Sequence, residues 1–562
     1  MRLINVSSMS VEEFVGRNIP QYGILSHTWE GSEVSYDEMR VGTARSKEAF
    51  HKIEMTCKLA SEDGLAYVWV DTCCIDKSSS AELTEAINSM FVWYKRATIC
   101  YVYLSDLESS ADVSTALKDC RWFSRGWTLQ ELIAPQKVDF FDQNWRFKGC
   151  KISLLEEISR ITGIGSTVLE HLAPLSSITV AARLSWAAYR ETTREEDAAY
   201  CLLGIFDVNM PLLYGEGTKA FRRLQEEIIK AECDLSIFAW RAKRSQSGQP
   251  DRRYSGILAE SPMEFSGCRG IIKANESTFH ADFSITNRGI RMHTGLSVFE
   301  TKHSQGLAYV QDLGCSISLK CVGPSRLGVK LRKCGPDMFV RDDPFSLLTI
   351  RSGSRNSTSL HRTIYILSKL PEIPHLPHSQ LLQRENDLII SCRTSAVQIR
   401  LPPGFESYSI RPASHFDEHD GLFFATSDAG QSWCFLVFKG DSLLNGRKTR
   451  LTCCFLCLNW NSQSRELVST LFNNDSCDRD LSTQFITGLE HAQHNRIPPA
   501  MRDLGLFGIP VQNCVAFKEM GSTLRISHSV QKVSQPDICN NEMYQVDITL
   551  EPLLTAQEAT AC

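Results

Sequence analysis

The stretch AYVWVDTCCIDKSSSAELTEAINSMFVWYKRATICYVYLSD (66–106) decides the fold class of this 562-residue chain. It begins with an apolar run, 66–71, that lacks polar alternation, as expected for a strand buried on both faces of a sheet. Ser79-x-x-Glu82 is a capping-box pattern, and the helix that it opens has apolar residues at helical spacing. The segment 98–106 is again strand-like. Strand, helix, strand is typical of an α/β unit with a parallel sheet.

The same alternation continues on both sides of this stretch. Upstream, 22–27 is a short apolar run that predicts a strand. The segment 46–64 carries apolar residues on one helical face, and Gly64 is its expected C-cap. Downstream, 137–142 predicts a fourth strand. Residues 151–240 show repeated helical spacing, which predicts a set of helices packed on the α/β core.

The composition of the sequence changes near residue 241. The segment 241–256 is basic, polar and interrupted by Gly and Pro, which indicates a linker or a long loop. Beyond it, short β-like runs alternate with turn residues, and we detect no repeat. We therefore predict three parts: 1–240, with an α/β core over about 1–150 and a helical extension over 151–240; the linker 241–256; and a mainly β region of unknown function over 257–562, as a sandwich or barrel.

Composition and charge narrow the class of protein. Hydrophobic residues make up 43% and charged residues 22% of the chain, which is typical of a globular protein. The net charge of -5 argues against a broad surface for nucleic acid or anionic membranes. The first residues lack the apolar segment of a signal peptide, and no apolar run is long enough to span a bilayer. We therefore expect a cytoplasmic protein of two to four domains.

The sequence contains 21 cysteines, which we expect to be free thiols in a reducing compartment. Cys454 and Cys457 form a C-x-x-C pair without a second pair or a His at zinc spacing, so we expect them to pack within a strand and predict no metal site. Cys73, between Asp71 and Asp76, is a conceivable nucleophile. No His is linked to it by spacing, and adjacent thiols often simply pack.

Polar side chains follow the predicted strands at their carboxyl ends. Ser26, His27 and Trp29 follow the first apolar run, and Asp71 follows the second. Because parallel sheets of this kind bind ligands at the carboxyl ends of their strands, we expect a crevice lined by hydroxyl, carboxylate and aromatic groups. His27 is either an acid–base group there or a hydrogen-bonded loop residue.

Two further motifs lie in the helical extension. Gly215-x-Gly217-x-x-Ala220 matches the loose dinucleotide-binding pattern and leads into a helix. No βαβ unit surrounds it, so we expect a helix-entry loop, with a phosphate cradle as the alternative. Thr193-x-x-Glu196 is a capping-box pattern.

Glu131 stands in an otherwise apolar run within RWFSRGWTLQEL (121–132). Thr128-x-x-Glu131 is a capping-box pattern, and a Glu in the first helical turn also gains from the helix dipole, so a structural role explains it. The alternative is catalysis. The residue follows the third strand on the expected ligand edge, and Pro135 keeps the helix short, so that the helix mainly places its first turn.

These segments together resemble the fungal heterokaryon incompatibility (HET) domain family. The matching segments lie within residues 1–240 and include MRLINVSSM, YGILSHTW, the stretch 66–106, RWFSRGWTLQELIAP and DLSIFAW. The resemblance implies a role in fungal non-self recognition and in the regulated cell death that follows cell fusion. It also implies self-association through this domain, or a NOD-like or other incompatibility protein as partner.

HET domains are in turn remotely similar to TIR domains, many of which cleave NAD⁺ with a glutamate in a W-C-L-x-E-L segment. Trp127, Leu129, Glu131 and Leu132 match this segment, and Thr128 departs from it. The resemblance implies a TIR- or flavodoxin-like parallel sheet. It also implies Glu131 as the catalytic residue, NAD⁺ as the substrate, and no required cofactor.

The substrate would then meet side chains of the expected crevice. Arg121, Arg125 or His27 would meet the pyrophosphate, and Trp29 would stack on a base or on nicotinamide. The full expected set is Ser26, His27, Trp29, Asp71, Arg121, Arg125 and Trp127. The alternative function is a non-enzymatic signalling or self-assembly module, in which Glu131 is only a helix cap.

Overall fold

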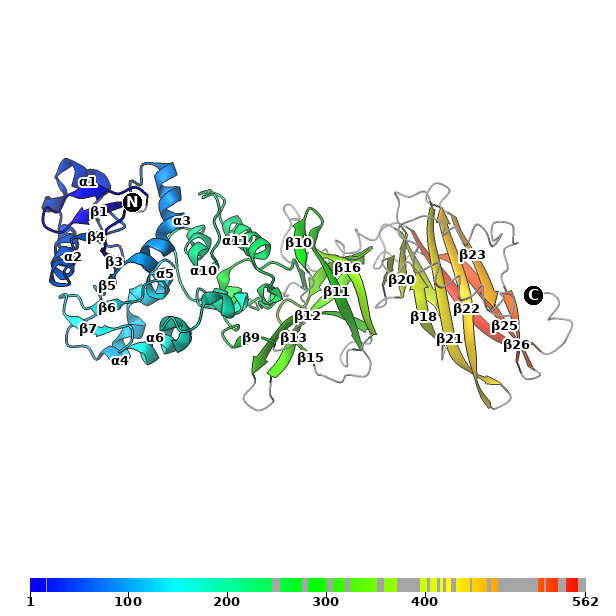
Figure 1. Ribbon diagram of the computed structural model, residues 1–562. Helices are drawn as coiled ribbons and strands as arrows, with labels where there is room; N and C mark the ends of the chain where they lie inside the picture. Colours follow the sequence, from blue (N-terminus) through cyan, green and yellow to red (C-terminus); the bar gives the residue numbers. More distant parts are fainter. Residues whose placement is uncertain are drawn as a thin grey trace.

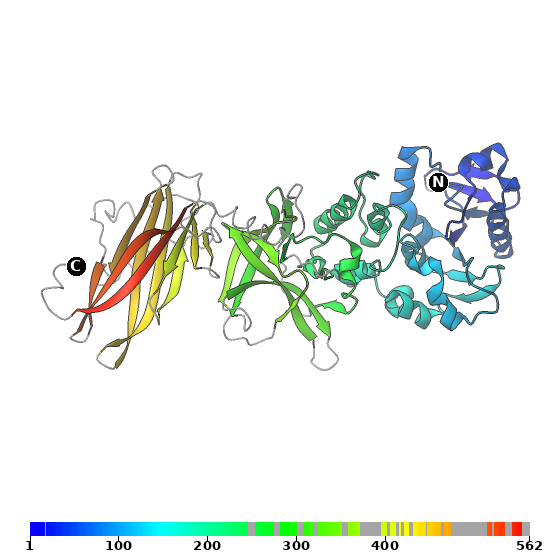
Figure 2. The same cartoon turned by 180° about the vertical axis from the view of Figure 1, so that it is seen from behind.

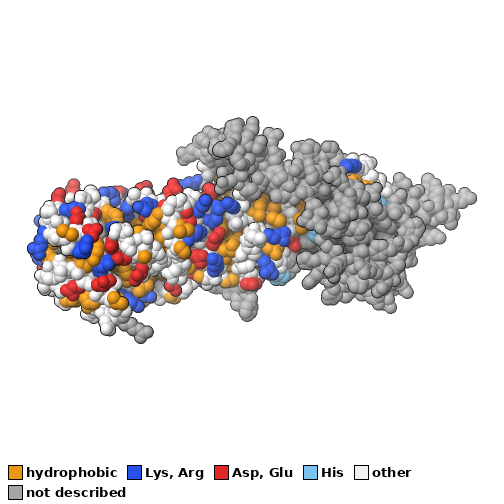
Figure 3. Space-filling view, turned by 90° about the horizontal axis from the view of Figure 1, so that it is seen from above, with side chains coloured by type: hydrophobic (Ala, Val, Ile, Leu, Met, Phe, Trp, Pro, Cys, Tyr) orange, Lys and Arg blue, Asp and Glu red, His pale blue; other side chains and the backbone are white. Residues whose placement is uncertain are grey.

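The chain forms an elongated molecule with an α/β part at one end and β-sheets toward the other, as two opposite views of the computed structural model agree (Figures 1 and 2). The structure describes residues 1–16, 18–244, 253–274, 282–300, 307–318, 324–350 and 358–370, and the strands and short adjoining segments between 395 and 553. On the face seen in Figure 3, acidic and basic side chains are interspersed over the described surface. Among the described residues, none of the helices has the length and apolar composition that crossing a bilayer requires.

The N-terminal sheet has seven strands in the order β2-β1-β4-β3-β5-β6-β7. They are β1 (Arg2–Asn5), β2 (Val11–Glu13), β3 (Gly23–His27), β4 (Tyr67–Trp69), β5 (Ile99–Tyr103), β6 (Val138–Phe141) and β7 (Phe147–Cys150). β3 pairs in parallel with β4 and β5, and β5 with β6, which confirms the four predicted strands and their direction. The edge strands β2 and β7, and β1 between β2 and β4, pair antiparallel and were not predicted.

Helices connect and cover these strands. They are α1 (Tyr36–Val41), α2 (Phe50–Glu62), α3 (Ser80–Arg96), α4 (Val113–Ala116) and α5 (Thr128–Ile133), with 3-10 turns η1 (Ala44–Ser46), η2 (Leu117–Asp119) and η3 (Arg121–Ser124). Ser79 caps α3 as predicted, because its hydroxyl accepts from the Glu82 backbone N–H at 3.4 Å. The Glu82 carboxylate instead accepts from the Asp76 backbone N–H at 2.8 Å, so only half of that capping box forms.

The predicted helical extension is a set of mostly short helices. They are α6 (Leu155–Thr162), α7 (Ser166–Leu169), α8 (Val180–Ser185), α9 (Asp197–Tyr200), α10 (Leu203–Phe206) and α11 (Lys219–Ala231), with η4 (Leu175–Ser177) and η5 (Leu235–Phe238). The described part of the chain beyond residue 252 is mainly β, as predicted, apart from η6 (Pro262–Phe265).

Three further sheets make up this β region. A nine-stranded sheet has the path β10-β11-β16-β14-β13-β12-β9, with β8 and β15 beside it; the others have the orders β19-β20-β17-β26-β25-β24 and β18-β21-β22-β23. Their strands are β8 (Tyr254–Ser255), β9 (Ile271–Lys273), β10 (Phe283–Thr286), β11 (Gly289–Glu300), β12 (Leu307–Ser318), β13 (Pro324–Gly335), β14 (Met338–Asp342), β15 (Leu348–Ile350), β16 (Thr358–Ile366), β17 (Ser395–Arg400), β18 (Phe405–Arg411), β19 (Phe416–Asp417), β20 (Leu422–Ala425), β21 (Gln431–Leu444), β22 (Arg447–Asn461), β23 (Glu466–Asn473), β24 (Cys514–Glu519), β25 (Ser522–Val533) and β26 (Glu542–Leu553). Cys454 and Cys457 lie within β22, the strand position that the sequence predicts.

One hydrophobic core runs from the N-terminal sheet into the nine-stranded sheet. Its buried members extend from Leu3 to Ile366. The side-chain amide of Gln225 on α11 donates to the Ala259 carbonyl at 2.8 Å and accepts from its N–H at 2.9 Å. Residues 245–252 of the predicted linker lie outside the described residues, and the proposed boundary stays a prediction.

Candidate functional site

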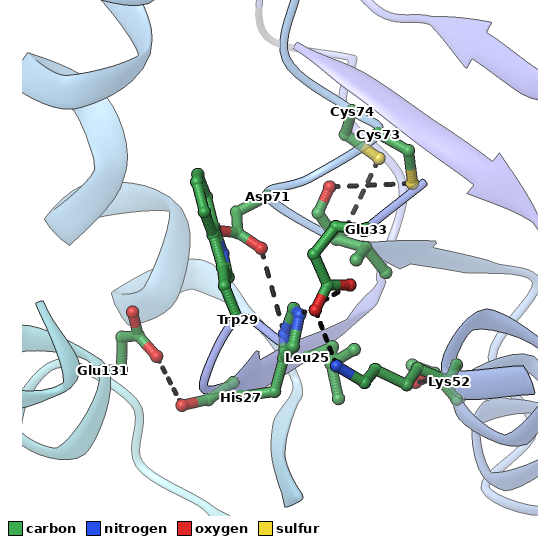
Figure 4. Close-up of polar contacts among 12 residues, drawn as sticks. Leu25, His27, Trp29, Glu33, Lys52, Asp71, Cys73, Cys74 and Glu131 are labelled. Atoms are coloured by element: carbon green, nitrogen blue, oxygen red, sulfur yellow. Dashed lines mark hydrogen bonds and ion pairs between the residues drawn. The ribbon is translucent and has the colours of Figure 1, made fainter. Parts of the chain in front are cut away.

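Ser26 and His27 are the last two residues of β3, and they face opposite sides of the sheet because successive side chains of a strand alternate. Ser26 is fully buried, and its hydroxyl donates to the carboxylate of Glu131 (Figure 4). The same hydroxyl accepts from the indole N–H of Trp122 at 2.7 Å. Ser26 therefore joins β3, η3 and α5 through one short polar chain.

Glu131 is not a helix cap. The N-cap of α5 is Trp127, whose indole cannot accept a capping bond, and Thr128 is already inside the helix. The Thr128 hydroxyl donates to the Arg125 carbonyl at 2.9 Å instead of receiving a backbone N–H. The capping-box prediction is therefore wrong, because α5 begins one residue earlier than the pattern requires. The Glu131 side chain consequently faces Ser26 near the carboxyl end of β3.

Burial raises the pKa of Glu131 to about 8, with only 7% of the residue exposed. The Ser26 hydroxyl opposes this shift by hydrogen bonding to the carboxylate, while the nearby charge of Asp71 adds to it. The positive charge of Arg190, whose guanidinium donates to the Thr128 hydroxyl at 2.9 Å, favours the ionised form. At pH 7 the neutral carboxylic acid is the favoured form in this state.

His27 lies on the other face of β3, between two carboxylates. Its Nε2 is 3.6 Å from Glu33 and its Nδ1 is 3.9 Å from Asp71 (Figure 4). Within the described residues neither ring nitrogen has a hydrogen-bond partner, although the imidazole is buried. Lys52 donates to Glu33 at 2.7 Å. Burial opposes ionisation of Glu33, but His27 and Lys52 outweigh it and lower its pKa to about 2.

Trp29 is 53% exposed just beyond β3. Its indole N–H donates to Asp71 at 2.8 Å, so the carboxylate that neighbours His27 also fixes the orientation of this ring. The ammonium of Lys77 lies 3.7 Å from the centre of the indole ring, over its face. The predicted members His27, Trp29 and Asp71 are therefore brought together as one group.

Arg121 forms ion pairs with acidic side chains near the carboxyl ends of β3 and β5. Its guanidinium pairs with Glu30 at 2.5 Å and with Asp106 at 3.3 Å. The hydroxyl of Ser105, which follows β5, also donates to Glu30 at 2.6 Å. Arg121 therefore bridges the loops that follow β3 and β5.

Arg125 and Trp127 contact the helical extension. The guanidinium of Arg125 donates to the Thr193 hydroxyl at 3.3 Å, and the indole N–H of Trp127 donates to Asp197 at 3.2 Å. A role for either residue in substrate binding stays a prediction.

The glycine motif in the extension binds an internal carboxylate. The backbone N–H groups of Gly215 and Gly217 donate to Glu196 at 2.7 and 3.0 Å. Glu196 is itself the N-cap residue of α9, so the predicted Thr193-x-x-Glu196 capping box is wrong. The loop donors that a phosphate would need are satisfied by this carboxylate.

The described residues offer neither a metal-binding group nor a reactive thiol at Cys73. They contain no group of three or more His, Cys, Asp or Glu side chains arranged to hold a metal ion. Cys73 is fully buried, and contact with Cys74 together with burial raises the pKa of its thiol well above the usual value. A buried neutral thiol is a poor nucleophile, which favours the packing role for Cys73.

Comparison with known proteins connects this geometry to a family. A family model described as heterokaryon incompatibility protein (HET) matches residues 22–117. The chain contains a HET domain. The matched residues include β3, β4 and β5, and with them Ser26, His27, Trp29 and Asp71. A second model, a domain of unknown function (DUF8212), matches residues 219–301 and runs across the predicted linker.

A curated relative extends the similarity. The chain is 47% identical over 253 residues to the vegetative incompatibility protein HET-E-1 of Podospora anserina. This stretch covers 43% of the chain and 19% of HET-E-1, so the chain spans about a fifth of the length of that relative. No solved structure matches the chain.

Several side chains of the HET domain site were missed by the sequence reasoning. Trp122 donates to Ser26, Glu33 and Lys52 flank His27, and Lys77 covers Trp29. Trp122 lay in the quoted segment around Glu131, and only its burial against Ser26 distinguishes it from the neighbouring Trp127. The other three lie in loops or on a helix with no recognisable motif.

Proposed function

We propose that this chain acts in heterokaryon incompatibility, in the cytoplasm, and that its HET domain hydrolyses NAD⁺ with Glu131 as the catalytic carboxylate. The observation that carries the proposal is the buried Glu131 carboxyl, anchored by Ser26 at the carboxyl end of the central strand β3. A carboxyl group in such a place needs a reason, because burying an ionisable group lowers stability unless it is paired.

The order of the parallel strands supports a TIR-like site. Across the sheet, the parallel strands follow one another as β4, β3, β5 and β6. If they are numbered one to four as they occur along the chain, this order is 2-1-3-4. Flavodoxin-like sheets have this order and bind ligands between their first and third strands, where the order reverses. Ser26 ends the first of these strands and Ser105 follows the third, on either side of that point.

The chemistry requires one well-placed negative charge. Cleavage of the nicotinamide–ribose bond passes through an oxocarbenium-like state, which a neighbouring carboxylate stabilises. Nicotinamide leaves as a neutral molecule and needs no strong acid. The positive charge of a bound nicotinamide ring would favour ionised Glu131, opposing the shift that burial causes. Substrate binding would thus charge the catalytic group.

The test is nicotinamide release from NAD⁺ by the purified full-length chain and its Glu131→Gln variant. Glutamine keeps an acceptor for the Ser26 hydroxyl but cannot ionise. We expect the rate to fall by about 10²-fold or more while the melting temperature does not fall. Glu38→Gln is the matched control, since Glu38 forms a complete capping box with Ser35 on α1 and should retain the wild-type rate.

Two outcomes would refute the enzymatic proposal. One is a Glu131→Gln variant that releases nicotinamide as fast as wild type. The other is growth arrest by the wild-type chain in a fungal or yeast host while cellular NAD⁺ stays level.

The second candidate is a non-enzymatic signalling module that self-associates or recruits a NOD-like or other incompatibility protein. It is favoured by the 7% exposure of Glu131 and by its preference for the neutral form at pH 7. In that function Glu131 only joins α5 to β3. Growth arrest by Glu131→Gln at the wild-type level would select this candidate.

A further inference from the structure

Trp29 presents an aromatic face whose orientation is fixed by a hydrogen bond. The ring is 53% exposed, whereas Trp69 and Trp122 of the same domain are almost fully buried. The bond from its indole N–H to Asp71, at 2.8 Å, holds the ring in place without a packed environment. An exposed aromatic ring that is already oriented loses little conformational entropy when a ligand stacks on it.

A cation already occupies one face of this ring. The Lys77 ammonium lies 3.7 Å from the ring centre, the geometry of a cation–π contact. Lys77 is an exposed residue, and the desolvation of its ammonium lowers its pKa, while the charges of Asp71 and Glu33 act in the opposite direction. The ammonium therefore balances carboxylates, and its four-carbon stem can swing away.

We propose that this face of Trp29 is a subsite for a cationic aromatic ring, an N-alkylpyridinium, and that Lys77 is a resident cation which the ring displaces. Charge balance gives the reason. A neutral ligand that displaced Lys77 would remove a positive charge from the neighbourhood of the Asp71 carboxylate, whereas a pyridinium replaces one positive charge with another; Glu33 keeps its ion pair with Lys52 in either case.

The subsite deepens the proposed function and rests on it for the identity of the natural ligand. The nicotinamide ring of NAD⁺ is an N-alkylpyridinium, and the ring of NADH is neutral. Asp71, which holds Trp29, also interacts electrostatically with Glu131. Figure 4 shows Trp29 standing between Glu131 and the Asp71–His27–Glu33 group in that view. The subsite would therefore select the oxidised over the reduced dinucleotide.

The test uses two probes of nearly the same shape that differ in charge. The full-length chain is labelled with 5-fluorotryptophan, and the Trp29 resonance is assigned by its loss in Trp29→Phe. We expect cationic N-methylnicotinamide to shift this ¹⁹F resonance at concentrations where neutral nicotinamide does not. In Lys77→Met the resident cation is gone, so the cationic probe should bind about 5-fold or more tightly, as a cation–π contact of about 1 kcal/mol implies. Lys58→Met, an exposed lysine on α2, should bind it as wild type does.

Equal affinity for the two probes would overturn the proposal, and so would a Lys77→Met variant with unchanged or weaker binding of the cation. Neither probe contains a bond to ribose, so these results do not depend on catalysis. Absence of nicotinamide release from NAD⁺ by a chain that discriminates between the probes would reject the proposed function and leave the cation subsite standing.

Discussion

At the scale of single residues, the proton on Glu131 links the site to the stability of the fold. Its pKa is about 8 in the folded chain, against an ordinary value of 4.5. Between these two values the folded state binds more protons than the unfolded state, so the free energy of unfolding decreases as pH rises from 4.5 through 8. Ionisation of the buried Glu131 carboxyl therefore destabilises the folded state, and the hydrogen bond from Ser26 offsets only part of this cost.

We expect this decrease to be on the order of 3–5 kcal/mol for wild type and to be missing in Glu131→Gln. Urea denaturation of both proteins at pH 5 and pH 8 measures it, because the contributions of all other groups are common to both and cancel in the difference. Parallel pH profiles for the two proteins would contradict the raised pKa of Glu131.

At the same scale, the sequence predicted individual site residues better than the contacts between them. Ser26 and Glu131 were both predicted site residues, but their direct bond was not, because 105 positions separate them. Alternation along a strand decides that Ser26 and His27 face opposite ways, so Ser26 contacts Glu131 while His27 lies beside Asp71 and Glu33. Only the packing of α5 shows which of the two side chains contacts Glu131.

At the scale of elements, α5 depends on a buried lysine at its C-terminal end. The Lys151 ammonium donates to the Pro135 carbonyl at 2.5 Å and to the Leu132 carbonyl at 3.4 Å, and it lies 3.2 Å from the His171 ring. A positive charge at a helix C-terminus is favourable, and these carbonyls close the helix that carries Glu131. Burial nevertheless lowers the pKa of Lys151 to about 8.

Lys151→Met should reduce the free energy of unfolding by about 2–4 kcal/mol, because it removes a buried charged donor from the Leu132 and Pro135 carbonyls. Chemical denaturation at pH 7 measures the change. The exposed Lys137, at the loop before β6, supplies the control Lys137→Met, for which we expect a change within about 0.5 kcal/mol. If the two variants are equally stable, Lys151 does not hold the end of α5.

Elements with strong periodicity were predictable from the sequence, and short ones were not. The runs that form β3 to β6 and the apolar face of α3 have clear patterns over several residues. β2 and β7 have three and four residues, and their antiparallel pairing at the sheet edges leaves no local signal. The start of α5 was misplaced because Trp127 adopts helical angles (φ -61°, ψ -37°), which the capping-box pattern does not anticipate.

At the scale of the whole molecule, Arg341 fastens the nine-stranded sheet to the end of the helical extension. It is fully buried on β14, and its guanidinium donates to the Phe238 carbonyl at 3.0 Å and the Trp240 carbonyl at 2.6 Å. Its charge also lies 3.9 Å from the centre of the Trp240 ring. Because of the shared core and this contact, we predict that the two regions stay associated after the chain between them is cut.

Limited proteolysis should cut first within 241–256, and the two products should still migrate together in native size-exclusion chromatography. Arg341→Met should cost about 3 kcal/mol of stability, because two buried carbonyls lose a charged donor, and should let the nicked products separate. Arg291→Met, an exposed arginine on β11, is the control. Separation of the wild-type products would show two independent domains.

If the HET domain completes its site by self-association, as we propose from the expected resemblance to TIR domains, nicotinamide release should rise faster than linearly with chain concentration. Rates over a hundredfold range of concentration, alongside light scattering for molecular mass, measure this. Strictly linear rates from a demonstrated monomer would reject the assembly proposal while leaving the catalytic role of Glu131 open to its own test.

The core shared between the HET domain and the nine-stranded sheet also sets an order of events on the ribosome. Chain growth proceeds at about 5–20 residues per second, so the interval between residue 240 and residue 366 lasts on the order of 10 s. During that interval we expect the nascent helical extension to expose apolar side chains that later parts of the chain cover in the folded structure. We therefore expect chaperones and proteases to meet this surface briefly on every full-length chain, and permanently on any product truncated near residue 240.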